Sequence, residues 1–258
     1  MTTARAFSLI DEIASVAKPV LVLSGGEPLF RSDIFDIAEY GVRTGLRMAL
    51  ATNGTLVTER VAAKIAATGF SRVAISLDGA NPDTHDRFRG MPGAHGKALA
   101  GLRYLRAEGV SVQINSTVAK HNVSELPALL DLALTIGADA LHLFMLVPVG
   151  CGLEIAPAEM LPADEYERVL HWFDDQAQTC PIDLKATCAP HYYRDPRAAA
   201  RGGTAPRQFR RHLHCARHQG EGGPHLYDGA SRPRRPAAIG DDARLSGRDQ
   251  RVLHLEPG

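Results

Sequence analysis

The sequence is poor in cysteine, and its cysteines are scattered. Only four occur among 258 residues, and none forms a CxxC pair. That number and spacing exclude a fold built on disulfide bonds. Long apolar runs are also missing, since none reaches the roughly 18 residues that would cross a bilayer. The first residues lack the basic-then-apolar pattern of a signal peptide, so we expect a cytoplasmic protein.

Neither sign of charge is in excess, because Lys+Arg and Asp+Glu both total 29. This balance argues against a general attraction to nucleic acid or to an acidic membrane. No lysine follows Lys185, while Arg, Gly, Pro, His and Ala crowd residues 194–258. That segment has neither a helical nor a strand period, so we expect it to be disordered.

Between residues 19 and 186, apolar runs alternate with segments of helical period. Such alternation with short connections is typical of parallel strands joined by right-handed crossovers. The expected strands are 20–23, 46–52, 72–77, 110–118, 140–147 and 182–186. The expected helices are 5–17, 33–43, a segment capped by Thr58, 96–108, 125–136 and 164–176, with a loop over 80–95.

Polar clusters stand at the carboxyl ends of five of these strands. They are 24–27, 52–54, 76–79, 116–117 and 148–152. In a barrel of parallel strands all carboxyl ends share one face, which carries the active site. An open doubly wound sheet is the alternative, but it gathers its ligand residues at one switch point. We therefore expect an α/β fold with a partial, TIM-like (β/α)6 barrel.

The segment Ser24-Gly-Gly-Glu-Pro28 is the clearest of these strand ends. Gly25 and Gly26 let the backbone turn sharply and let another molecule approach it closely. Glu27 follows at the position where α/β folds place their ligands. The alternative interpretation is a tight turn with a solvated glutamate.

Three segments in this order form a specific combination: Ser24-Gly-Gly-Glu-Pro28, Ala51-Thr-Asn-Gly-Thr55 and Ile75-Ser-Leu-Asp-Gly79, with Asp86-Arg-Phe-Arg-Gly90 just after the third. Together they resemble the core of radical S-adenosylmethionine (SAM) enzymes, over residues 1 to about 194. The resemblance implies a radical SAM barrel and two cofactors, SAM and a 4Fe–4S cluster. It also implies generation of a 5′-deoxyadenosyl radical, with the protein positioning the cofactor that does the chemistry.

The resemblance also assigns cofactor-binding residues. Gly25, Gly26 and Glu27 match the segment that binds the SAM amino group, and an ammonium needs acceptors such as these. Ser76 and Asp78 match positions near the ribose or the methionine part. The resemblance implies no catalytic residue.

Two further residues belong to the same expected pocket. Arg89 is expected to pair with the SAM carboxylate, whose shape a guanidinium matches, and Asn53 lies beside the pocket. Each has a structural alternative: Asn53 forms only a turn, Ser76 is a satisfied strand-end hydroxyl, and Arg89 is a surface charge. For His142 on the fifth strand, core packing is favoured over ligation.

Finer segments resemble the haem-biosynthesis branch with a SPASM-type auxiliary cluster, which includes alternative haem b synthase and the haem d1 biosynthesis radical SAM protein. They are Asp78–Ala80, His85–Gly90, Leu146–Gly150 and Lys185–Arg194. This branch implies a tetrapyrrole substrate whose side chains are decarboxylated or removed, and an electron donor such as flavodoxin or ferredoxin. Maturation of a peptide substrate is the alternative. Cys188 is the candidate metal ligand, for an auxiliary 4Fe–4S cluster.

The sequence departs from the family in two places. The CxxxCxxC loop, whose three thiolates hold the family's cluster, does not occur in it. We expect an N-terminal truncation and, because residues 195–258 resemble a shifted reading frame, a C-terminal frameshift. The expected domains are 1–160 (partial barrel), 161–194 (last helix and start of the auxiliary-cluster region) and 195–258 (aberrant tail). A catalytically dead SAM-binding fragment is therefore a further alternative.

Overall fold

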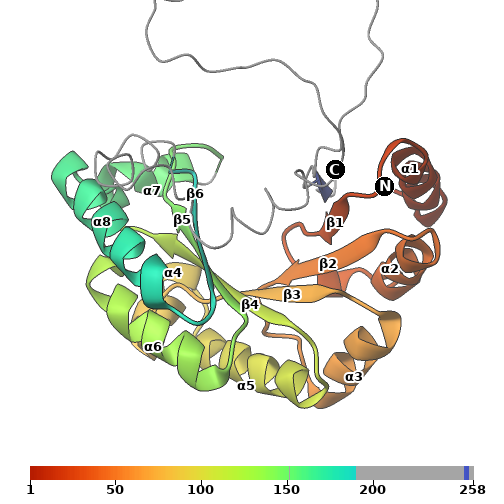
Figure 1. The fold of residues 1–258 in the computed structure, drawn as a ribbon, viewed down its shortest axis with the longest axis horizontal. Helices are drawn as coiled ribbons and strands as arrows, with labels where there is room; N and C mark the ends of the chain where they lie inside the picture. The colour runs from red at the N-terminus through yellow and green to blue at the C-terminus, as the bar shows by residue number, and fades with distance from the viewer. Residues whose placement is uncertain (151, 190–252, 256–258) are drawn as a thin grey trace, which may run out of the picture.

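The structure is a computed structural model that describes residues 1–150, 152–189 and 253–255. Six strands follow in chain order, each joined to the next by one or two α-helices (Figure 1). The strands are β1 (Val20–Leu23), β2 (Arg47–Thr52), β3 (Arg72–Ser76), β4 (Val112–Val118), β5 (Ala140–Met145) and β6 (Asp183–Thr187). The helices are α1 (Thr3–Val16), α2 (Ile34–Arg43), α3 (Glu59–Thr68), α4 (Pro82–Arg89), α5 (Ala94–Ala107), α6 (Leu126–Ile136), α7 (Gly152–Glu159) and α8 (Ala163–Thr179).

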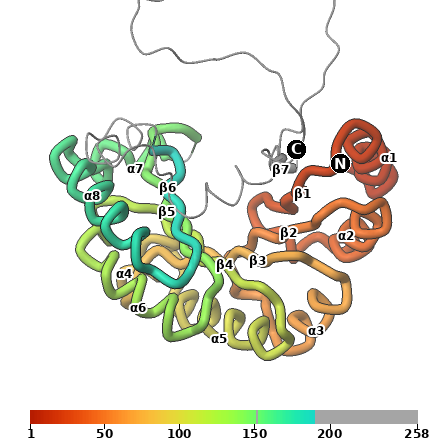
Figure 2. The backbone as a smooth tube through the Cα atoms, viewed as in Figure 1, coloured from red at the N-terminus to blue at the C-terminus, as the bar shows by residue number. Residues whose placement is uncertain are grey.

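A short seventh strand, β7 (Leu253–Leu255), pairs with β1. All strand pairs of the sheet are parallel, and the strand order is β6-β5-β4-β3-β2-β1-β7. The sheet curls into half of a barrel, with helices along its convex side (Figure 1). The tube in Figure 2 shows β1 with α1 on one side of the half-barrel and β6 with α8 on the other. The carboxyl ends of β1 to β6 therefore form one rim. This arrangement confirms the expected partial barrel and excludes the doubly wound alternative.

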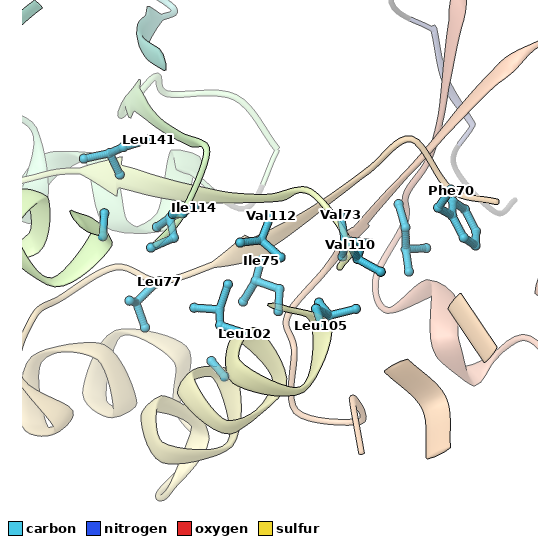
Figure 3. Close-up of a cluster of buried hydrophobic side chains, with 14 of the residues drawn as sticks. Phe70, Val73, Ile75, Leu77, Leu102, Leu105, Val110, Val112, Ile114 and Leu141 are labelled. Atoms are coloured by element: carbon cyan, nitrogen blue, oxygen red, sulfur yellow. The ribbon is translucent and has the colours of Figure 1, made fainter. Parts of the chain in front are cut away.

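The two faces of the sheet differ because successive residues of a strand point to opposite sides. On β4, Val112 and Ile114 are fully buried on the convex side. Figure 3 shows them with Ile75 of β3 and Leu102 of α5 in one apolar core between sheet and helices. The alternate residues of the strands face the concave side. That side carries the polar residues from which the candidate site is built.

Local signals explain why most helices were predicted correctly. Thr58 precedes α3, and its side chain accepts a hydrogen bond from the backbone N–H of Val61, as an N-cap should. Gly69 ends the same helix in the left-handed conformation with φ of 85°, which a residue without Cβ adopts at little cost.

The loop expected over residues 80–95 was wrong, because it contains α4. Pro82 opens this helix, and Gly90 closes it with φ of 62°, so both ends carry ordinary helix signals. His85 is its only buried residue. With so little apolar surface to bury, the helix shows no apolar period from which it could be predicted. The sequence interpretation also missed α7.

Two sequence expectations concern the ends of the chain and the membrane. No helix in the described part of the chain is long and apolar enough to cross a membrane.

Most of the segment 195–258 lies outside the described residues. Its residues Leu253–Leu255 form the short strand β7, which pairs with β1, so these three residues differ from the expected structureless tail.

Candidate functional site

Glu27 ties the end of β1 to the end of β2. Its Oε1 accepts hydrogen bonds from the Thr52 hydroxyl at 2.7 Å and the Leu29 N–H at 3.1 Å, and its Oε2 accepts one from the Asn53 N–H at 2.8 Å. A carboxylate has about four acceptor positions, so one is left for a bound molecule. Gly25, two residues before Glu27, has φ of 148°, a conformation that favours glycine.

The Asn53 side chain stabilises a turn, which is the alternative role that the sequence analysis gave for this residue. Its Oδ1 accepts hydrogen bonds from the Thr55 N–H at 2.8 Å and the Thr55 hydroxyl at 2.7 Å. Gly54 follows with φ of 80°, and a Cβ there would lie 2.9 Å from Ile75. Because the Asn53 oxygen is used in the turn, only its NH₂ group is available to a ligand.

Asp78 and Arg89 form an ion pair that is buried on one side only. The Asp78 side chain is 0% exposed, whereas 33% of the Arg89 side chain is exposed. Arg89 places Nε 2.6 Å and Nη2 2.5 Å from Asp78 Oδ2, and the Thr117 N–H donates to Asp78 Oδ1 at 2.7 Å. The fully buried carboxylate therefore orients Arg89, whose Nη1 remains available.

Further hydrogen bonds hold the Asp78 loop in place. The Asp78 N–H donates to His85 Nδ1 at 3.0 Å. The Asn122 side chain donates to the Asp78 and Thr117 carbonyls at 2.8 and 2.7 Å. Burial lowers the pKa of His85, and the nearby Asp78 carboxylate only partly opposes that effect. His85 therefore remains neutral and acts as a structural acceptor.

A pocket of about 190 Å³ lies at the carboxyl ends of β3, β4 and β5. It is lined by Ser76, Arg89, Asn115, Ser116, Thr117 and Phe144. Ligand pockets of proteins span roughly 300–1,000 Å³, so this one has room for only a part of a typical small-molecule ligand. Ser116 is fully buried, and its Oγ has no hydrogen-bond partner among the described residues.

The pocket joins two of the predicted site residues, Ser76 and Arg89, but Glu27 and Asn53 do not line it. They sit on the neighbouring ends of β1 and β2. Sequence reasoning missed Asn115 and Phe144. The signal for Asn115 was the polar alternation of β4, with Gln113, Asn115 and Thr117 at every second position. Phe144 is on β5, in an apolar run that gives no such signal.

A polar network leads from the pocket along the concave face. Gln113 Nε2 lies 2.6 Å from Asn115 Oδ1 and 2.9 Å from His142 Nδ1. Burial lowers the pKa of His142 to about 3, and the charges of Lys185 and Arg72 act in the same direction. His142 is thus a neutral, half-buried residue of the concave face, which is the inner face of the half-barrel.

The described residues provide no cluster of metal ligands. Within residues 1–150, 152–189 and 253–255, no three His, Cys, Asp or Glu side chains are grouped so that they could hold a metal ion. Cys188 is a free, exposed thiol with φ of 58° just after β6. Cys151 and Cys215 lie outside the described residues.

A second, larger hollow of about 560 Å³ lies beside the turn between α4 and α5. Its lining residues include Asp83, Arg87 and Pro92, all of which are exposed. None of them stands at a strand end. The smaller pocket at the rim of the sheet is therefore the candidate site.

Comparison with known proteins identifies the family of the chain. The Radical SAM superfamily profile matches residues 1–133. The chain is 52% identical over 201 residues to the AdoMet-dependent heme synthase of Methanosarcina barkeri, covering 78% of this chain and 57% of that protein. It is 41% identical over 152 residues to the pre-heme d1 synthase of Dinoroseobacter shibae, covering 59% of this chain and 37% of that protein. The chain thus spans about half the length of the curated relatives it matches.

Among solved structures, Streptococcus suis SuiB bound to its precursor peptide SuiA superposes with a TM-score of 0.62. The match covers 77% of this chain and 45% of SuiB, at 17% sequence identity. At that identity the likeness supports the fold alone. The profile match extends over more than half of the chain, from α1 through β4 into α6. The chain belongs to the radical SAM superfamily.

Proposed function

We propose that this chain carries the SAM-binding half of an enzyme that uses SAM-dependent radical chemistry to remove or decarboxylate side chains of a tetrapyrrole. The observation that carries the proposal is the 52% identity to a haem synthase across 201 residues. Any stretch of 201 residues in this chain of 258 includes residues 76–144, and with them the residues that line the rim pocket. Within the superfamily, SAM bound to a reduced 4Fe–4S cluster supplies a carbon radical that abstracts hydrogen from the substrate.

The residues of the rim pocket fit SAM. Arg89 is oriented by a buried carboxylate and keeps donors free, which suits the methionine carboxylate of SAM. Ser76 and Asn115 offer hydroxyl and amide groups to a ribose, and Phe144 offers an apolar ring to adenine. A Cβ added at Gly26 would have no neighbour within 4 Å, so the turn after β1 leaves room for the amino group.

The described residues do not fit a 4Fe–4S cluster. The chain contains no CxxxCxxC segment, and the described part of it offers no triad of metal ligands. We therefore assign no step of the reaction to a cluster held by these residues. An auxiliary cluster at Cys188 stays a proposal, as do a cytoplasmic location and a flavodoxin or ferredoxin donor.

A peptide substrate is the second candidate, as the sequence interpretation left open. SuiB, whose structure contains a precursor peptide, shares only its fold with this chain. The haem synthase similarity is much higher in identity than the SuiB similarity, at 52% against 17%. The tetrapyrrole is therefore the proposal that we test first.

The test uses the full chain under anaerobic conditions with iron, sulfide, a reductant, SAM and iron-coproporphyrin III. We expect SAM binding in equilibrium dialysis, with affinity about tenfold lower for Arg89→Gln, since a charged hydrogen bond contributes roughly 1.5–3 kcal/mol. Arg103→Gln, at an exposed position of α5, is the matched control.

Three outcomes separate the hypotheses. Release of 5′-deoxyadenosine together with a lighter porphyrin supports the enzyme. SAM binding without iron uptake and without turnover supports the catalytically dead SAM-binding protein. Absence of SAM binding in a folded sample contradicts both.

A further inference from the structure

One row of polar side chains crosses the concave face from β3 to β6. The strand register aligns Ser76 with Asn115, Asn115 with His142, and His142 with Lys185. Aligned residues of neighbouring parallel strands point to the same side, and neighbouring strands lie about 4.8 Å apart. Ser76 and Asn115 line the rim pocket. His142 and Lys185 therefore continue the row outward from that pocket.

The hydrogen bonds fix the orientation of His142. Gln113 donates to its Nδ1 at 2.9 Å, and the same amide group also meets Asn115. Because Nδ1 accepts, the proton of the neutral ring is on Nε2. Among the described residues, no acceptor is hydrogen-bonded to this Nε2–H. The ring is thus held as a hydrogen-bond donor without a protein partner.

The surroundings of His142 are cationic. Lys185 and Arg72 are the charges that act on it. The Asp183 side chain is 57% exposed, and its Oδ2 lies 3.9 Å from Arg72 Nη2. This carboxylate therefore pairs with Arg72. Lys185 is exposed and has no ion-pair partner within the described ranges. The row two positions earlier in each strand contains Ala51, Ala74, Gln113 and Ala140.

We propose that His142 of β5 and Lys185 of β6 form a carboxylate-binding site for the substrate beside the rim pocket. A carboxylate accepts hydrogen bonds only, so it matches a fixed Nε2–H donor beside an ammonium that has no ion-pair partner among the described residues. The inference rests on the proposed function, because it assigns this place to one carboxylate side chain of the tetrapyrrole.

The experiment measures binding of iron-coproporphyrin III and of its tetramethyl ester to the full chain by tryptophan fluorescence quenching and equilibrium dialysis. The acid and the ester share the ring but differ in charge. We expect Lys185→Gln and His142→Gln each to weaken binding of the acid about tenfold. Binding of the ester should be the same in the variants and in the parent chain.

Controls separate a binding role from a folding role. Lys97→Gln removes an exposed lysine of α5, on the convex side of the sheet, and should change neither affinity. Lys185→Arg keeps the charge and should restore binding of the acid. If Lys185→Gln bound iron-coproporphyrin III with unchanged affinity, the proposed carboxylate-binding site would be wrong, while the proposed function would stand. Failure of the parent chain to bind either porphyrin would overturn both.

Discussion

Asp78 and Arg89 share an ion pair, but only Asp78 is cut off from water. This asymmetry predicts unequal costs when either partner is removed. Arg89→Gln leaves a carboxylate charged in a fully buried place, which costs roughly 3–5 kcal/mol of folding free energy. Asp78→Asn leaves an arginine that can turn to solvent, so we expect only about 1–3 kcal/mol. Urea denaturation measures both values, and equal costs would contradict the asymmetry.

His142 makes stability depend on pH. Its pKa is lowered from 6.5 to about 3 in the folded chain, mainly by burial. Between these values the unfolded chain binds the proton and the folded chain does not, so stability falls as pH falls from about 6.5 towards 3. The slope contributed by one such group is at most about 1.4 kcal/mol per pH unit.

The corresponding variant is His142→Gln, measured by urea denaturation from pH 7 to pH 4. Its free energy of unfolding should fall less steeply with acid than that of the parent chain. At pH 8 His142 is neutral in both the folded and the unfolded chain, so a comparison at this pH isolates the effect of the substitution itself. His85 has a shift of the same sign, and it remains in both proteins. Parallel curves would show that His142 is not the group that titrates.

At the scale of elements, two glycines in helices have opposite roles. Gly41 of α2 packs against β2, and a Cβ there would lie 2.3 Å from Met48 Sδ. Met48 is fully buried, so its side chain has no free space to enter. Gly41→Ala should therefore destabilise the chain by about 1–3 kcal/mol.

Gly96 of α5 is the matched case, because it is exposed and a Cβ there meets nothing within 4 Å. Gly96→Ala should stabilise the chain by about 0.4–1 kcal/mol through lower entropy of the unfolded state. Thermal and urea denaturation of the two variants test the packing of α2 on the sheet. If Gly41→Ala left the free energy of unfolding unchanged, α2 would be able to move away from β2.

On the scale of the whole molecule, the half-barrel separates a face for stability from a face for binding. Ile114 and Thr117 lie on the same strand but on opposite faces, and Ile114 is 0% exposed in the apolar core (Figure 3). Ile114→Ala should cost about 2–5 kcal/mol of folding free energy. Thr117→Ala removes a side chain that lines the rim pocket. It should cost under about 1 kcal/mol but weaken SAM binding in equilibrium dialysis.

Much of this molecule could be predicted from the order and period of its residues. Apolar runs predicted β1 to β6 within a few residues, since a strand covered on both sides leaves a continuous apolar signature. The helix α4 could not be predicted in this way, because it buries only His85. The domain boundaries at 160 and 194 stay predictions. So do the roles of all candidate site residues: Gly25, Gly26, Glu27, Asn53, Ser76, Asp78, Arg89 and Cys188.

The parallel α/β class and the family follow from the sequence alone, because short motifs and apolar periods are local properties of the chain. The same motifs predict the rim on which the candidate site lies. The tertiary structure sets how polar groups are shared. It assigned Glu27 to Thr52 and Asn53, buried Asp78 beneath Arg89, and aligned His142 with Lys185. These partners are far apart along the chain. Hydrogen bonds and burial depend on which strands become neighbours, and no local pattern encodes that arrangement residue by residue.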